Sequence, residues 1–80
     1  MEMIKNEFFH ELHSFLEIKS IHELNEKTEL KSLEEWDSML ILTIIAFIDQ
    51  NFNQTIAAEK LNAIKTIGDL MQIIGISNFQ

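Results

Sequence analysis

The stretch that decides the fold runs from residue 36 to residue 52 and reads WDSMLILTIIAFIDQNF. At Asp37 a polar, acidic composition changes abruptly to an apolar run. Because aspartate is a favoured N-cap residue, we expect a helix that begins at Ser38 and extends to about Phe52. A helical wheel places five residues on one face, which we expect to lie in the core: Ile41, Ile44, Ile45, Ile48 and Phe52. The opposite face is unusually apolar for a surface that meets water: Met39, Leu42, Thr43, Ala46, Asp49 and Gln50.

A second helix is expected near the N-terminus, where apolar residues recur every three or four positions. They are Ile4, Phe8, Leu12, Phe15 and Leu16. The face opposite this stripe should be solvated, and it carries Glu2, Asn6, His10, His13 and Glu17. The predicted helix spans about residues 2–17.

The chain between residues 18 and 37 has apolar residues at irregular spacings and forms no continuous stripe. We predict a long ordered loop with room for one helical turn, pinned to the core by Leu30, Leu33 and Trp36. A connection of this length is uncommon in a small domain unless it serves a purpose.

The C-terminal third predicts a short helix and then a longer one. Residues 57–61 have room for one or two helical turns, after a polar turn at residues 53–55. Thr66, with Asp69 three residues later, resembles a capping box, and Ile67, Leu70, Met71 and Ile74 continue the helical spacing towards Gly75. The predicted fold class is all-α, a small bundle of three main helices plus one short helix, with a long first loop.

Composition limits the possible functions. The chain has 80 residues and a mass of 9.4 kDa, which predicts a single domain spanning residues 1–80. Six Lys+Arg against thirteen Asp+Glu give a formal charge of −7, which disfavours nucleic acid and favours partners with basic patches. The most apolar run, residues 39–48, is too short for a membrane span of about 18 residues. With no cysteine and no signal peptide, we expect a cytoplasmic monomer without membrane insertion.

The sequence offers no catalytic or metal-binding constellation that is complete. His10 and His13 lie one helical turn apart, but nothing completes a metal site, so we predict none. Residues 49, 51, 53 and 55 match an EF-hand loop, yet Gln54 and Lys60 replace the glycine and the glutamate that such a loop needs. None of the five serines lies in a strand-turn-helix elbow, and nothing in the sequence arranges a histidine and an acid around one as a catalytic triad. We therefore expect no enzymatic activity.

Ser38 differs from the other serines because it follows a capping aspartate at the start of the most apolar helix. A helix N-terminus favours negative charge, so a phosphate esterified to Ser38 would be stabilised there. In this context the chain resembles the acyl carrier protein, or phosphopantetheine-binding, family over nearly its whole length. The resemblance rests on residues 35–39 (EWDSM), similar to the family's Asp-Ser-Leu attachment motif, on Phe52 with Ile56 four residues later, and on residues 64–70 (IKTIGDL), similar to the start of the family's last helix.

The resemblance implies that Ser38 carries a 4′-phosphopantetheine cofactor, which a separate magnesium-dependent phosphopantetheinyl transferase adds from coenzyme A. The thiol of this arm would hold an acyl group as a thioester for acyl-loading and acyl-using biosynthetic enzymes. Asp37 would cap the helix and help to present the serine. Such a carrier catalyses nothing itself and supplies a tethered substrate at high effective concentration.

Two groups of residues acquire roles from this resemblance. An enzyme that reaches the arm must pass over the face next to Ser38, so we expect Met39, Leu42, Thr43, Ala46 and Asp49 to bind partners. The acyl chain should be sheltered between this helix and the later ones, in a pocket lined by Ile41, Ile45, Ile56, Leu61 and Ile64.

The distribution of acidic residues distinguishes this chain from carriers of central fatty acid synthesis, which resemble one another in a second helix rich in Glu and Asp. Here that surface keeps Asp49, and the acids lie in the loop at Glu23, Glu26, Glu29, Glu34 and Glu35. We therefore expect a carrier dedicated to one specialised pathway. Two alternatives stay open: an aminoacyl or peptidyl carrier, and an unmodified helical module that docks through the same helix.

Overall fold

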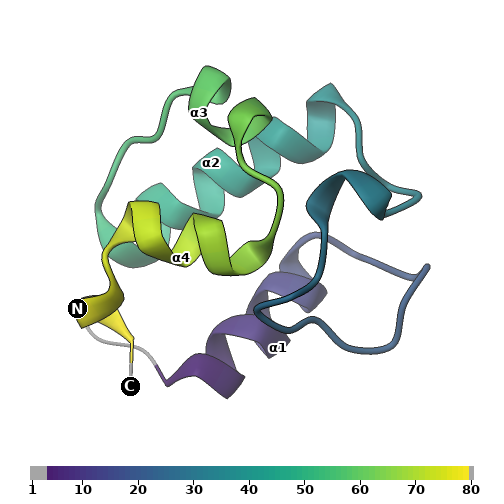
Figure 1. Cartoon of the computed structure of the whole chain (residues 1–80), viewed down its shortest axis with the longest axis horizontal. Coiled ribbons are helices and arrows are strands. Elements are labelled where there is room, and N and C mark those ends of the chain that lie inside the picture. Colours follow the sequence, from purple (N-terminus) through teal and green to yellow (C-terminus); the bar gives the residue numbers. More distant parts are fainter. Residues whose placement is uncertain (1–3, 80) are drawn as a thin grey trace.

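Four α-helices and two 3-10 turns follow one another in the computed structural model, which describes residues 4–79 (Figure 1). They are α1 (Lys5–Phe15), η1 (Leu30–Ser32), α2 (Ser38–Phe52), α3 (Ala58–Ala63), α4 (Ile67–Ile74) and η2 (Ile76–Asn78). Within residues 4–79 there is no strand, and one isolated bridge joins Glu29 to Thr66. The predicted all-α bundle of three main helices, one short helix and a long first loop is confirmed.

α2 has the bounds that the sequence predicts. The Asp37 side chain accepts a hydrogen bond from the Leu40 amide at 2.8 Å, which fixes the start of the helix. At the other end, Asn53 adopts the left-handed conformation with φ 54°, and its amide donates to the Asp49 carbonyl. These two ends account for a helix that stops after Phe52.

The buried face of α2 is rotated relative to the predicted one. The buried residues are Leu40, Ile44, Phe47, Ile48 and Phe52. Ile41 and Ile45, which we predicted to be core residues, are only half-buried. The reason is α1, because the rings of Phe8 and Phe15 lie 6.0 and 5.2 Å from the ring of Phe47. These contacts bury the side of the helix that carries Phe47, a residue that the predicted core face does not include.

α1 is shorter than predicted and buries a narrower stripe. Phe8 and Leu12 are fully buried, whereas Ile4 and Phe15 are 48% and 42% exposed. Ile4 and Phe15, near the two ends of the predicted apolar stripe, are therefore exposed, and its middle is buried. Past the end of the helix, Glu17 adopts a left-handed conformation with φ 53°, which turns the chain away from the helix axis. Glu2, the predicted first residue, lies outside the described residues.

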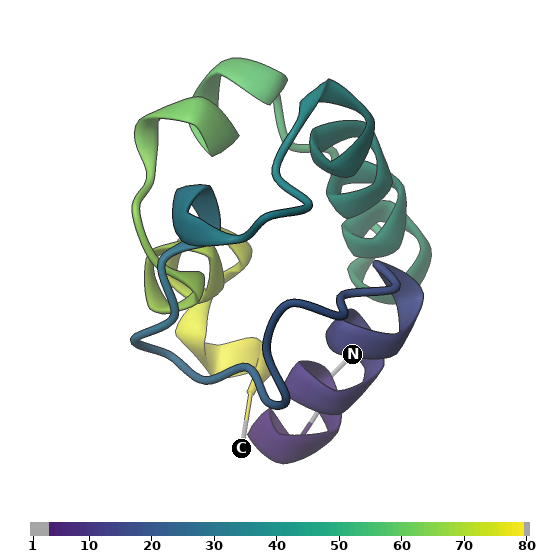
Figure 2. The same ribbon diagram turned by 90° about the vertical axis from the view of Figure 1, so that its right-hand side faces the viewer.

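The long loop is ordered and contains the one helical turn that the sequence allowed, η1. Leu30 and Leu33 are buried and Trp36 packs partly against the core, as predicted. In Figure 2 the loop leaves α1, crosses to the side of the molecule that holds α3 and α4, and returns to α2. It therefore links the two sides of the bundle.

Three backbone hydrogen bonds tie the loop to the start of α4. The Leu30 amide donates to the Lys65 carbonyl at 2.9 Å. The Ile67 amide donates to the Thr28 carbonyl at 3.0 Å, and the Gly68 amide donates to the Glu26 carbonyl at 2.9 Å. The approach at Gly68 is so close that a Cβ there would lie 2.9 Å from the Glu26 carbonyl oxygen. Glycine is therefore required at this contact.

α4 begins with the capping box that the sequence predicts. Thr66 accepts from the Asp69 amide at 3.1 Å, and the Asp69 carboxylate accepts from the Thr66 amide at 3.2 Å. The pKa of Asp69 is lowered, chiefly by the hydrogen bond from the Lys65 amide and then by that from Thr66. The apolar residues whose spacing predicts α4 are all buried: Ile67, Leu70, Met71 and Ile74. Among residues 4–79, no helix combines the length and apolar character needed to cross a bilayer.

Candidate functional site

Ser38 occupies the first position of α2, and it is exposed. The first amides of a helix have no acceptor within the helix itself. The Asp37 carboxylate accepts the hydrogen bond of the Leu40 amide. Within the described part of the chain, the amides of Ser38 and Met39 have no acceptor. The Ser38 hydroxyl therefore stands beside free N–H groups at the positive end of the helix dipole, where a negatively charged group is favoured.

The residues before Ser38 are held in place one by one. The Trp36 amide donates to the Leu33 carbonyl at 3.1 Å, and the Trp36 side chain packs against the core. Asp37 contributes twice, through its side chain to the Leu40 amide and through its carbonyl to the Ile41 amide at 3.2 Å. The serine is thus presented by an ordered segment.

Glu35 makes the most extensive polar contact of this segment. One carboxylate oxygen accepts from the amides of Lys19 and Ser20 at 2.8 and 3.0 Å, and the other accepts from the Ser20 hydroxyl at 2.6 Å. The Ser20 hydroxyl, followed by the Lys19 amide, lowers the pKa of Glu35 from 4.5 to about 2. We call this set of three hydrogen bonds the Glu35 clamp. Sequence reasoning counted Glu35 only as part of the motif and of the acidic loop, because no sequence pattern pairs it with Ser20.

The surface of α2 next to Ser38 is apolar and open to solvent. Met39 and Leu42 are 67% and 59% exposed, and Ala46 and Asp49 are exposed as well. Thr43 is half-buried, and its hydroxyl donates to the Met39 carbonyl at 2.8 Å. The five residues predicted to bind partners therefore form one continuous strip of the helix, beginning beside Ser38. Their role in binding stays a prediction.

The residues predicted to shelter an acyl chain lie in and around the core. Ile56 and Leu61 are 4% and 0% exposed, while Ile41, Ile45 and Ile64 are half-buried and pack against the same cluster. α2, which carries Ile41 and Ile45, packs against α3, which carries Leu61. All five residues therefore belong to one core cluster or to its edge. Their role as an acyl pocket stays a prediction.

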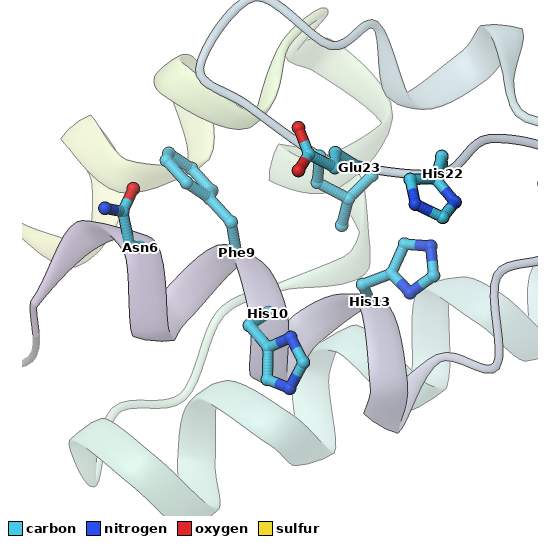
Figure 3. A pocket seen from close by; sticks show the side chains of 7 residues that line it. Asn6, Phe9, His10, His13, His22 and Glu23 are labelled. Carbon is cyan, nitrogen blue, oxygen red and sulfur yellow. The ribbon is translucent and has the colours of Figure 1, made fainter.

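A separate groove of about 600 Å³ lies between α1 and the loop (Figure 3). It is lined by Asn6, Phe9, His10, His13, His22, Glu23 and Leu24. His13, predicted to be solvated, is half-buried, and its Nε2 donates to the Ile21 carbonyl at 2.9 Å. The rings of His13 and His22 face one another, whereas His10 points away from them. No group of three or more metal-binding side chains occurs among residues 4–79, and the groove includes no residue of α2.

Comparisons with protein-family models, with curated proteins and with solved structures found no match to this chain.

Proposed function

We propose that this protein is an acyl carrier, modified on Ser38 by 4′-phosphopantetheine. The observation that carries the proposal is the setting of Ser38. It is an exposed hydroxyl at the first position of an apolar helix, directly after the Asp37 cap. When bound, the arm supplies a thiol that holds an acyl group as a thioester.

The transferase moves the phosphopantetheine group from coenzyme A to the Ser38 oxygen. The Ser38 oxygen forms a bond to the phosphorus of coenzyme A that bears the pantetheine. The bond from this phosphorus to the adenosine bisphosphate breaks, and the hydroxyl proton passes to a base of the transferase. The resulting phosphodiester is negatively charged, and the free amides of Ser38 and Met39 together with the dipole of α2 favour that charge.

The remaining residues of the site serve presentation and docking. Trp36 and Asp37 hold the segment that offers Ser38 to the transferase. Met39 and Leu42 lie on the surface over which every enzyme must pass to reach the arm. An apolar contact of this kind suits a small set of dedicated partners, such as the loading and using enzymes of one specialised pathway. An aminoacyl or peptidyl cargo would use the same arm.

The exposed apolar strip also favours a second candidate, an unmodified interaction module that docks through α2. Met39 and Leu42 are exposed whether or not Ser38 is modified. The two candidates differ in one property, because only a carrier needs the Ser38 hydroxyl.

The test is the intact mass of the protein after incubation with coenzyme A, magnesium and a broad-specificity transferase. A carrier gains one phosphopantetheine, and Ser38→Ala gains none. Ser32→Ala is the matched control, because Ser32 is also exposed and lies in the nearby turn η1. An unchanged wild-type mass would leave the interaction module as the better account.

A further inference from the structure

The Glu35 clamp joins the two ends of the long loop. Glu35 is 15 and 16 positions away from Ser20 and Lys19, and both of its carboxylate oxygens are used. Hydrogen bonds to an ionised carboxylate are shorter and stronger than those between neutral groups. The clamp is therefore a strong polar link that closes the loop just ahead of Ser38.

One side of the clamp is anchored to α1. Lys19 and Ser20 follow directly on Ile18, which is 3% exposed and whose amide donates to the His13 carbonyl at 3.2 Å. Glu17, at φ 53°, turns the chain so that Ile18 reaches the core. The donors of the clamp, on Lys19 and Ser20, thus directly follow a buried residue that is bonded to α1, so their positions are fixed relative to that helix.

The other side of the clamp leads to the modification site. Glu35 is followed by Trp36, Asp37 and Ser38, so only two residues separate the clamp from the modified serine. Trp36 packs partly against the core, and Asp37 binds α2. Glu35 supplies the hydrogen bonds that link this segment to Lys19 and Ser20, just past the end of α1.

We propose that Glu35 is a positioning residue for the modification of Ser38. Its carboxylate holds the segment of residues 35–37 against Lys19 and Ser20, where the loop leaves α1, so that the hydroxyl is offered to the transferase in one orientation. This inference rests on the proposed function, since it concerns the reaction at Ser38. It assigns a role to a residue that lies outside the Asp-Ser pair.

The expected kinetic effect follows from the population of competent molecules. Without the clamp, the segment samples other arrangements, and only a fraction of the protein can be bound productively. The apparent affinity of the transferase for the carrier falls by that fraction, whereas the rate at saturation is unchanged. The KM for this protein should therefore rise while kcat stays the same.

The experiment compares Glu35→Gln with Glu34→Gln. Both variants remove one negative charge, at adjacent positions, but exposed Glu34 makes none of the clamp's contacts. Phosphopantetheine transfer is measured at several carrier concentrations. Fluorescence of Trp36, the only tryptophan, reports on the segment, and circular dichroism reports on the helices.

We expect Glu35→Gln to raise KM about tenfold, with kcat within about twofold of wild type. Trp36 emission should shift to the red and become easier to quench while the helix signal is unchanged. Ser20→Ala, which removes only the hydroxyl bond, should give a smaller shift of the same kind, and it provides the test if Glu35→Gln does not fold. Glu34→Gln should match wild type in KM and in fluorescence.

Two results would overturn the inference, and they are distinguishable. If wild type accepts an arm but Glu35→Gln and Ser20→Ala behave like Glu34→Gln, the positioning role is wrong and the carrier function stands. If wild type accepts no arm, the proposed function is wrong, and the role of Glu35 in it is wrong too.

Discussion

Three consecutive residues ahead of α2 are held by three different parts of the molecule. Glu35 binds the loop where it leaves α1, Trp36 packs on the core, and Asp37 caps the helix that begins with Ser38. Each contact fixes one residue of the segment. Together they place the exposed Ser38 hydroxyl at a defined point of the surface.

Asp37→Ala should destabilise the protein by about 1 kcal/mol, because the Leu40 amide loses its acceptor. Asp37→Asn should stay close to wild type in stability, since asparagine is an equally good N-cap residue. Urea unfolding followed by circular dichroism measures both values. Equal stability of Asp37→Ala and wild type would show that the cap contributes nothing.

The Glu35 clamp predicts a specific pH dependence of stability. The pKa of Glu35 is about 2 in the folded protein against 4.5 as its ordinary value. A carboxyl group with a lowered folded-state pKa stabilises the fold above its unfolded-state pKa, and this contribution is lost as the pH falls from about 4.5 towards about 2. Glu35→Gln should therefore melt below wild type at neutral pH, and the difference should shrink across this window. A difference in melting temperature that is constant with pH would contradict the clamp.

The sequence predicts some of these residues and not others, for a physical reason. Asp37 and Ser38 could be identified because capping is local and leaves its signature within four residues. The partner of Glu35 could not be identified, since Ser20 lies 15 positions away in a loop without periodicity. The same holds for His13, whose acceptor is the Ile21 carbonyl, eight positions further along the chain.

At the level of the element, α2 serves two purposes on two faces. One face fills the core through residues such as Ile44 and Ile48, which are fully buried. The other presents Met39 and Leu42 to solvent, next to Ser38. The bounds of α2 and the capping box of α4 could be predicted from the sequence. The centre of the buried face of α2 could not, because it depends on the rings of Phe8 and Phe15 in α1, and a helical wheel of α2 does not include them.

Leu42→Glu should sharply reduce turnover with the cognate loading enzyme and leave the fold intact. Leu42 is 59% exposed, so a charge there costs little in the free protein but must be desolvated in an apolar interface. Asp49→Ala, at the far end of the exposed strip, should have a smaller effect. Turnover is measured on the modified protein at two ionic strengths, with circular dichroism as the folding control.

An apolar interface should weaken only modestly with added salt, because burial is not screened. The acidic loop can still steer the approach of a basic partner. A greater loss with Asp49→Ala than with Leu42→Glu, together with collapse of binding at high salt, would show that the carrier docks electrostatically.

At the level of the whole molecule, the long loop joins the two sides of the bundle. It binds the start of α4 through Leu30, Thr28 and Glu26, and Glu35 near its second end binds Lys19 and Ser20, where the loop leaves α1. The sequence predicts that the loop is long and pinned by apolar residues. Its backbone pairing with α4 could not be predicted, because it depends on the close approach that Gly68 permits.

An acyl chain on the arm should stabilise the bundle if it is sheltered between α2 and the later helices. Burial of an alkyl chain is worth roughly 0.8 kcal/mol per CH₂. Since Ile56 and Leu61 are buried and already packed, the chain must part these side chains to enter. The gain from burying several CH₂ groups should exceed the cost of that rearrangement, so a medium-length acyl group should raise the melting temperature and slow amide exchange in α2 and α4.

The control for this prediction is an acyl group of the same length that ends in a carboxylate, because a charged end resists burial. It should give less stabilisation than the plain chain. If neither cargo changes melting temperature or amide exchange relative to the unloaded arm, the chain is not sheltered there.

The central claim is that Ser38 is the single attachment site, and the most direct measurement locates the arm by mass spectrometry. Cleavage after lysine leaves Ser32 and Ser38 on one peptide, because no Lys or Arg occurs between Lys31 and Lys60. Fragmentation of this peptide from wild type should place one phosphopantetheine on Ser38. Ser32→Ala should be modified equally, and Ser38→Ala should remain unmodified. An arm on any other residue, persistent modification of Ser38→Ala, or no modification of wild type would contradict the account.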